Sequence, residues 1–469
     1  MRRAAVLVAL ILVALALVAL RPPPRPGPLL RDFEAYYAAG ASWTGEIDPY
    51  SRDVWRVEGH LPGVDARRDE ILPFVGPPYT LPLFGLLGAL PFIQATPVWG
   101  AFLALAALVL AFCIARLAQI RDVPALAGLL LLGAAFGPLT SALALGQLAL
   151  PACAGVVATT AALQTRVRLI VPIVTALAAA LQPNIGCALI GRLSDRRASA
   201  AFAIAAIFAL SSGVAALGGF AGVQHYLTVL RAHAAAESTV AIQVTVAAVT
   251  YGFGASDVIA SRIALGVAVV VILTTAWLLR SVAYTPASRV AIASAALPLV
   301  LPFAHEHDLL VTLFPAVLVL RAALGIRWIV AACATMMVAV DWLGLAQRPQ
   351  ALTQAAVLAF AAAFAIIALS RPPSLRAAAV PLGVAVCVVV AGLFGAQHPV
   401  GVWPYALPSS FHAPLDADVS TVWHLEQVAS GLATPNFGSA LLRGASVAGC
   451  ALLWGSSLVV LRRSKYRRS

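Results

Sequence analysis

Apolar runs close to the length that an α-helix needs to cross a bilayer, roughly 20 residues, recur along the chain. They cover residues 4–20, 79–93, 97–115, 123–140, 147–164, 169–191, 198–217, 260–279, 286–304, 309–320, 327–343, 351–369, 377–395 and 439–461. Of all residues, 61% are hydrophobic and 11% are charged, whereas soluble chains carry about 25% charged residues. A water-soluble fold is therefore excluded, and the sequence predicts an all-α polytopic membrane protein.

Several of these runs are short or are broken by proline, as Pro82 and Pro91 break the run at 79–93. Irregular backbone at membrane depth is tolerated only where protein surrounds it, so some runs are expected to be re-entrant. The run at 4–20 lacks a small-residue cleavage site and is interpreted as an uncleaved first span rather than a secretory signal. We expect one integral-membrane domain over residues 1–469, a bundle of about 12–14 transmembrane helices.

The formal net charge of +12 comes almost entirely from arginine placed between apolar runs. That distribution is typical of cytoplasmic loops, and no exposed domain is available to carry a nucleic-acid surface. If every run crosses and Met1 is cytoplasmic, the C-terminus with its basic tail at 462–469 is cytoplasmic as well. The same alternation places Arg116, Arg121, Arg166 and Arg168 outside, against the rule that short outer loops are poor in arginine.

Three longer segments are then predicted on the outer side, at 21–78, 218–259 and 396–438. Each is too short and irregular for a separate globular domain, so we expect loops and short amphipathic helices packed on the bundle. Trp403 and Trp423 in the last segment are expected in the interfacial aromatic belt, although an acceptor-binding role stays open.

The first outer segment contains a carboxylate with an aromatic neighbour. On a helix that begins near Leu29, Asp32, Tyr36 and Ala39 share one face. Such a carboxylate could act as a general base toward an alcohol substrate. The alternative is that Asp32 caps the start of the helix.

A second polar group follows the run at 286–304, where His305, Glu306, His307 and Asp308 are consecutive. The group lacks the H-E-x-x-H spacing that places two histidines on one helical face, so no metal site is expected. Ionisable groups at the end of a span are more often functional, which favours a contact to phosphate or hydroxyl. Solvation at the membrane interface is the alternative.

Arg231 in the second outer segment, with His233 near it, could meet a lipid phosphate, although polar residues on a surface helix are most often solvated. The six cysteines show no metal-ligand spacing. The sequence also lacks the Walker A, dinucleotide-binding and Gly-x-Ser-x-Gly motifs. No cofactor and no metal is expected.

The order of motifs in the first outer segment resembles that of the GT-C glycosyltransferases. Asp32-Phe33 with Tyr36 follows the first span, Gly45 with Pro49-Tyr50 comes next, and Pro77-Pro78-Tyr79 opens the second span. The chain most closely resembles glycosyltransferase family 87, the polyprenyl-phosphate-mannose-dependent mannosyltransferases of bacteria.

The resemblance implies roles for individual residues. Asp32 would match the catalytic base, Gly146-Gln147 resembles the family's Gly-Gln-Val-Asn, and Gln182-Pro183 stands in place of a Lys-Pro pair. His307 would match the first family histidine, while His305 replaces a tryptophan. The candidates for donor or acceptor contacts are Glu34, Tyr36, Tyr37, Tyr50, Gln147, Gln182, Arg231, His305, Glu306 and His307.

The expected reaction is transfer of a sugar, mannose by the resemblance, from a polyprenyl-phosphate donor to a lipid or glycan acceptor. It would take place on the extracytoplasmic side of a bacterial inner membrane, with inversion at the anomeric carbon. The main alternative is a transporter or flippase that binds a lipid-linked or small polar substrate without changing it. A lipid-linked polysaccharide polymerase or ligase is a further alternative.

Overall fold

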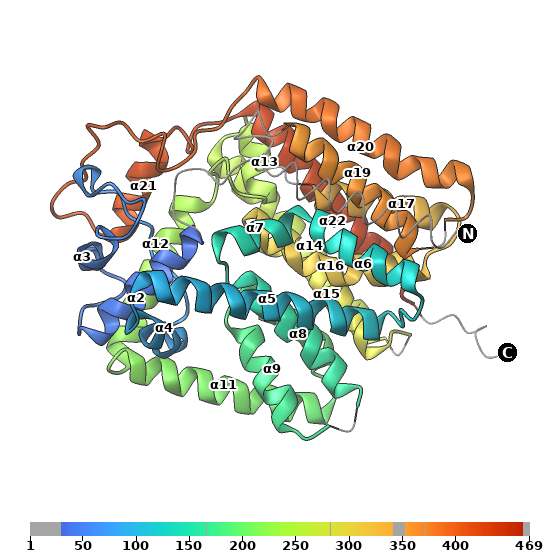
Figure 1. Ribbon diagram of the computed structural model, residues 1–469, viewed down its shortest axis with the longest axis horizontal. Helices are drawn as coiled ribbons and strands as arrows, with labels where there is room; N and C mark the ends of the chain where they lie inside the picture. The colour runs from blue at the N-terminus through green and yellow to red at the C-terminus, as the bar shows by residue number, and fades with distance from the viewer. Residues whose placement is uncertain (1–29, 166, 282, 341–351, 371, 463–469) are drawn as a thin grey trace.

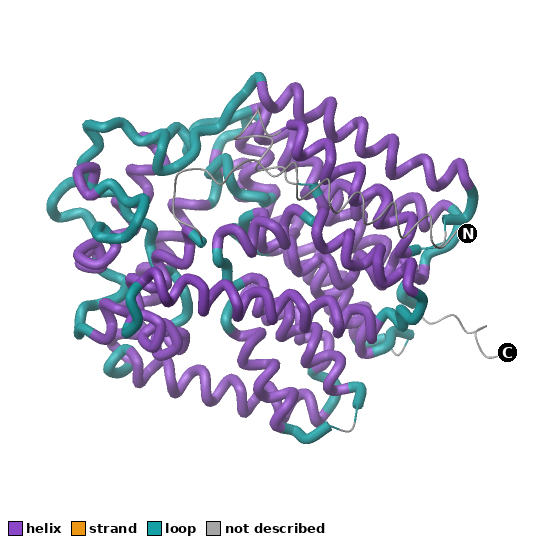
Figure 2. The backbone as a smooth tube through the Cα atoms, viewed as in Figure 1, coloured by secondary structure: helices purple, strands orange, loops and turns teal. Residues whose placement is uncertain are grey.

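The chain folds into an all-helical bundle in a computed structural model, which describes residues 30–462 except 166, 282, 341–351 and 371. Within these ranges every named element is a helix, as the purple segments of Figure 2 show. The first half contains α2 (Arg31–Thr44), η1 (Arg52–Val54), α3 (Trp55–Glu58), η2 (Ala66–Arg68), η3 (Pro78–Thr80), α4 (Leu81–Gly88), α5 (Phe92–Leu117), α6 (Val123–Ala135), α7 (Gly137–Leu145), α8 (Ala149–Leu163), α9 (Ile170–Ala180), α10 (Pro183–Gly186), η4 (Cys187–Arg192), α11 (Arg196–Ala216) and α12 (Phe220–Glu237). The second half contains α13 (Val246–Gly252), α14 (Asp257–Leu279), α15 (Pro286–Val300), η5 (Glu306–Thr312), α16 (Leu313–Ala322), α17 (Ile326–Ala339), α19 (Leu352–Leu369), α20 (Leu375–Ala396), α21 (Val419–Ala429) and α22 (Phe437–Val460).

The polytopic all-α prediction is confirmed, but fewer helices are long than the apolar runs suggested. Among the described residues, five helices are long and apolar enough to cross a membrane: α5, α11, α14, α20 and α22. The pair α6 and α7 adds a sixth if it is one span bent by 56°. Other apolar helices are shorter, such as α8 with 15 residues and α9 with 11, because proline and polar residues divide the runs. The predicted first span at 4–20 lies outside the described residues.

The apolar run at 169–191 is a re-entrant hairpin rather than a crossing. It divides into α9, α10 and η4, and the 11 residues of α9 span roughly 16 Å, about half of the hydrocarbon thickness. The hairpin returns to its starting end, because Arg192 Nη2 donates to Leu163 O (3.4 Å) and Arg197 Nη1 donates to Thr165 O (3.1 Å). Arg168 and Arg197 therefore lie at the same end of the bundle, and their predicted separation by the membrane is wrong.

The loop between α5 and α6, residues 118–122, lies beside Arg321 at the end of α16. Arg321 is 4.0 Å from Asp122 and donates to Leu369 O (3.1 Å). The outer placement of Arg116 and Arg121, opposite Arg321, is therefore also wrong. We call the end of the bundle formed by residues 116–122, 163–165, 167–168, 192–197, 280–281, 283–289 and 321–327 the arginine end. Its composition follows the arginine bias of cytoplasmic loops more closely than the strict alternation did.

The three long segments gather at the opposite end, which we call the loop end and which lies at the left of Figures 1 and 2. Helices α2, α3, α12 and α21 lie there. The third segment covers the first, since Arg31 donates to Trp403 O (2.7 Å) and its guanidinium lies 4.1 Å from the centre of the Trp403 ring. Arg68 likewise donates to the carbonyls of Pro404 and Leu407. The long segments thus pack on one another as well as on the bundle.

Close helix packing holds α2 against the bundle. A side chain at Gly40 would place Cβ 2.2 Å from the Phe84 backbone of α4, so only glycine allows this approach. On the neighbouring face, Phe33 is fully buried and stacks on Trp99 of α5 with ring centroids 5.5 Å apart. The direction of α2, and with it the position of Asp32, is fixed by these contacts.

Candidate active site

Asp32 lies in the first turn of α2, but its side chain does not cap the helix. The half-buried carboxylate accepts a hydrogen bond from the side-chain amide of Gln147. The hydroxyl of Tyr36, one turn along α2, donates to Gln147 Oε1 at 2.8 Å. Because Tyr36 occupies the amide oxygen, the amide nitrogen must face Asp32. The capping alternative is excluded, and the predicted shared face of Asp32 and Tyr36 is confirmed.

Gly146 allows Gln147 to approach α2 this closely. It ends α7 with a left-handed φ of 81°, a conformation that suits glycine. A Cβ there would lie 3.0 Å from both Leu30 and Phe33. The indole N–H of Trp99 donates to Gly146 O at 2.8 Å, which fixes the turn from the other side. The turn at Gly146 thus places the side-chain amide of Gln147 against the Asp32 carboxylate.

The tip of the re-entrant hairpin reaches the residues after α15. Gln182 donates its side-chain amide to Asp308 Oδ1, and Asp308 Oδ2 accepts from the backbone N–H of His305 at 2.9 Å. This second contact starts η5 in the manner of a helix cap. Gln182 stands where the resemblance leads us to expect a cationic residue. Its side chain contacts the carboxylate of Asp308.

His305 and His307 stack with ring centroids 5.3 Å apart and an interplanar angle of 20°. Burial lowers the pKa of His307, while the negative charges of Asp308 and Asp32 oppose that effect. Asp32 is therefore within electrostatic reach of His307, although they are far apart in sequence. The side chain of His305 is more accessible, at 29% exposed against 7% for His307.

A buried carboxylate that the sequence interpretation did not select lies behind His305. Glu237 of α12 is fully buried and accepts hydrogen bonds from the indole N–H of Trp423 and the side-chain amide of Gln243. Its Oε2 lies 3.7 Å from His305 Nε2. Trp423 is only 5% exposed, so its predicted place in an interfacial belt is wrong. The spacing of His233 and Glu237 on one face of α12 is the one sequence pattern that could have indicated this group.

Residues 74–302 match the family model of glycosyltransferase family 87. The chain contains a glycosyltransferase family 87 domain over these residues. Of the residues described above, Gln147, Gln182 and Glu237 fall inside the matched segment, whereas Asp32 precedes it and His305 follows it. No curated protein and no solved structure matches the chain. The multi-pass helical fold of this family 87 glycosyltransferase is consistent with the GT-C superfamily.

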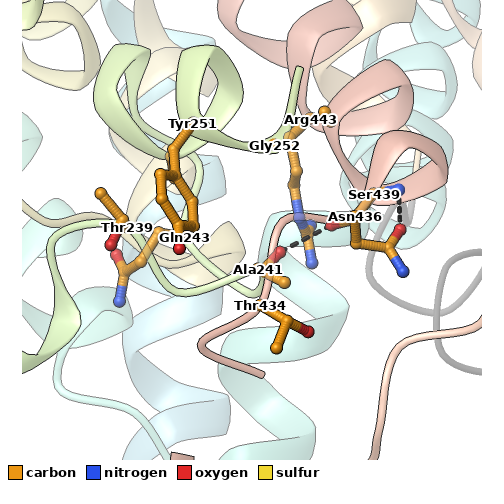
Figure 3. Close-up of a pocket in the computed structure, with 11 residues that line it drawn as sticks. Thr239, Ala241, Gln243, Tyr251, Gly252, Thr434, Asn436, Ser439 and Arg443 are labelled. Atoms are coloured by element: carbon orange, nitrogen blue, oxygen red, sulfur yellow. Dashed lines mark hydrogen bonds between the residues drawn. The ribbon is translucent and has the colours of Figure 1, made fainter. Parts of the chain in front are cut away.

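A small polar pocket lies beside this assembly, between α13 and the start of α22 (Figure 3). Gln243 forms part of its wall, with Tyr251 and the buried Arg443. Ser439 also lines it, and its hydroxyl donates to Ala241 O at 2.7 Å. Asp32 is not among the residues that line this pocket. The pocket therefore adjoins Gln243 but is not the cleft in which Asp32 would meet a substrate of the glycosyltransferase.

Several predicted contact residues lie elsewhere in the glycosyltransferase. Glu34 points to the other face of α2 and is 2% exposed; burial raises its pKa to about 8, although Arg31 opposes that shift. The hydroxyls of Tyr37 and Tyr50 donate to the carbonyls of Leu90 and Gly76, both at 2.8 Å. These three side chains lie in the packing of the loop end, and the Tyr37 and Tyr50 hydroxyls do not bond to Asp32.

Arg231 is exposed on α12, on a different face from Glu237, while Glu306 is buried at the start of η5. Their predicted contacts to substrate stay predictions. Within the described ranges, no three His, Cys, Asp or Glu side chains converge in a way that would hold a metal ion. Chemically, the assembly offers the glycosyltransferase one oriented carboxylate and, within its electrostatic reach, a pair of stacked imidazoles.

Proposed function

We propose that this family 87 glycosyltransferase transfers a sugar, mannose by the family resemblance, from a polyprenyl-phosphate donor to a hydroxyl of a lipid or glycan acceptor. The observation that carries the proposal is the half-buried Asp32 carboxylate, which Gln147 and Tyr36 orient beside the histidines of the 305–308 group. The apolar helices around it suit a donor whose isoprenoid tail stays in the membrane.

In the proposed reaction, Asp32 accepts the proton of the acceptor hydroxyl as the acceptor oxygen bonds to the anomeric carbon. The bond between that carbon and the phosphate oxygen breaks, and its electron pair stays on the phosphate. Because attack comes from the face opposite the leaving group, the configuration inverts. Gln147 holds Asp32 Oδ2, so Oδ1 is the oxygen best placed to take the proton.

The departing phosphate gains negative charge, which hydrogen-bond donors aimed at it would stabilise. His305 is the first candidate, because its ring is partly exposed while His307 is buried behind it. Gln182 supports this contact indirectly, because its amide holds Asp308, which in turn holds the His305 backbone. The donor is therefore proposed to lie with its phosphate toward His305 and its sugar toward Asp32.

The arginine end is proposed to face the cytoplasm and the loop end the extracytoplasmic side of a bacterial inner membrane. The arginine bias of short loops supports this orientation. Both termini are then predicted to be cytoplasmic.

The test is transfer of label from polyprenyl-phosphate-[14C]mannose to a membrane lipid extract by purified protein. Asp32→Asn should lower the rate at least about 100-fold, the usual contribution of a general base, without a change in thermal unfolding. Asp53→Asn is the matched control, since Asp53 is an exposed carboxylate of the same segment that pairs with Arg56. Equal transfer by wild type and Asp32→Asn would exclude Asp32 as the base. No transfer by the wild-type protein would exclude this donor and would favour the alternative that the protein is a flippase.

A further inference from the structure

We infer that Glu237 is a positioning residue for His305 and acts through the side chain of Gln243. The inference rests on the proposed contact between His305 and the donor phosphate. Glu237 lies on α12, and its Oε2 is 3.7 Å from His305 Nε2, while Gln243 contacts both groups.

The direction of the Gln243 amide is fixed by the backbone. Gln243 Oε1 accepts the backbone N–H of Ala304 at 2.8 Å, and the backbone N–H of Val244 donates to Ala304 O at 2.6 Å. The amide nitrogen must therefore point the other way, where it donates to Glu237 Oε2 and lies 3.2 Å from His305 Nε2. Gln243 connects the carboxylate to the imidazole in one orientation only.

Glu237 is itself held from two sides. Trp423 donates to Oε1 and Gln243 donates to Oε2, so both carboxylate oxygens have a partner and the side chain cannot rotate without losing one. The ionisable groups that face it are His233, which is one turn earlier on α12, and His305. His233 is buried and stacks on Trp423 with ring centroids 6.4 Å apart.

A fully buried carboxylate is costly to retain for packing alone, because an apolar side chain of similar size would avoid its desolvation. Here the chain of contacts leads from that carboxylate to the more exposed of the two histidines. An imidazole that binds a phosphate must hold its ring within a narrow range of angles, and misplacement by about 1 Å can lower a rate on the order of 100-fold. Glu237 and Gln243 restrain the His305 ring through its Nε2 atom.

Both partners of the Glu237 carboxylate, Trp423 Nε1 and Gln243 Nε2, are donors, so the amide of Glu237→Gln can accept from only one of them and turns its own N–H toward the other. The side chain at 237 then loses its bond to either Trp423 or Gln243, and the negative charge 3.7 Å from His305 Nε2 is removed in both cases. We expect kcat for sugar transfer to fall about 10- to 100-fold, with a smaller change in KM for the acceptor, which does not contact His305. Glu426→Gln is the matched control, because Glu426 is equally buried on α21 but accepts from the Ile71 backbone and does not touch His305.

A double-mutant cycle separates positioning from a structural role. In a His305→Ala background, Glu237→Gln should cause no further loss of kcat, because the group that it positions is already gone. An equal loss in both backgrounds, or no loss in the wild-type background, would overturn the inference. A normal kcat for His305→Ala alone would remove the proposed phosphate contact and the inference together, while leaving the role of Asp32 intact.

A structure of Glu237→Gln gives a readout that is independent of the donor and of activity. The His305 ring should rotate or lose its fixed position, while Asp32 and Gln147 stay in place. An unmoved His305 ring would contradict the inference even if the protein proved to use a different donor.

Discussion

Gln147 donates a side-chain hydrogen bond to the carboxylate of Asp32 across 115 residues of sequence. The two residues come from different layers of the bundle, α2 at the loop end and the link between α7 and α8. The Tyr36 hydroxyl fixes the Gln147 side-chain amide, whose nitrogen then holds Asp32 Oδ2. Asp32 Oδ1 stays available to a substrate. Each of these three side chains can be altered separately.

Replacement of Gln147 should lower kcat without a change in thermal unfolding. Gln147→Leu removes the donor to Asp32 and should lower kcat about 10-fold, the value of one hydrogen bond to a charged group. Gln147→Glu places a second carboxylate beside Asp32 and should have a larger effect. Steady-state transfer rates and thermal unfolding measure the two effects. Gln164→Leu, an exposed position after α8, should change neither.

Tyr36 and Tyr37 are adjacent but should respond differently to loss of the hydroxyl. Tyr36→Phe frees the Gln147 amide and should reduce kcat. Tyr37→Phe loses only the bond to Leu90 O and should lower the free energy of unfolding by about 1 kcal/mol with kcat unchanged. If Tyr36→Phe lowered stability and left kcat intact, the amide would not orient the carboxylate.

Gly146→Ala combines an unfavourable φ with contacts to Leu30 and Phe33 at 3.0 Å. Its cost should be about 1–3 kcal/mol of unfolding free energy, measured by denaturation in detergent. Gly133→Ala offers a comparison, because a Cβ there meets only Leu139 Cδ2 at an ordinary 3.6 Å. Similar unfolding midpoints for the two variants would show that α7 and α2 can separate without penalty.

The stability of the loop end should fall as pH rises. Burial raises the pKa of both Glu34 and Glu58 to about 8 from an ordinary value of 4.5. The folded state therefore holds protons that the unfolded state releases, and the stability present below pH 4.5 is lost progressively up to about pH 8. Glu34→Gln should flatten the thermal-midpoint curve between pH 5 and pH 9. The exposed Glu46→Gln should leave its slope unchanged.

Cysteine labelling tests the arrangement of the two ends. In a variant whose own cysteines are replaced by serine, Thr165→Cys and Ser194→Cys should react with a membrane-impermeant maleimide only after the inner face is exposed. Ser409→Cys at the loop end should react in intact spheroplasts. Labelling of Thr165→Cys and Ser194→Cys from opposite sides would contradict the re-entrant hairpin.

Local patterns in the sequence predict the helix of Asp32 and the face that it shares with Tyr36, because a period of 3.6 residues determines both. They do not predict that Gln147 meets Asp32 or that Glu237 lies behind His305, since those contacts depend on how distant helices pack. The resemblance to family 87 indicated Gln147, His305 and His307, and the family assignment is confirmed, while their roles stay predictions.

The sequence analysis missed two features, for identifiable physical reasons. Glu34 follows Asp32 by two residues, which on a helix places it about 200° away, in a buried cluster with Glu58 and Glu70. The arginine loops were divided between two sides because each apolar run was counted as a crossing. A run of 23 residues at 169–191 meets the length criterion, but Pro183 and the polar Gln182 turn the chain back at half depth.

The hairpin of α9, α10 and η4 has a consequence for the orientation of everything that follows it. A segment that leaves through the side by which it entered does not alter the parity of the remaining crossings. A longer or shorter hairpin would leave the direction of every later helix unchanged. The Gln182 tip could then diversify without inverting the rest of the protein in the bilayer.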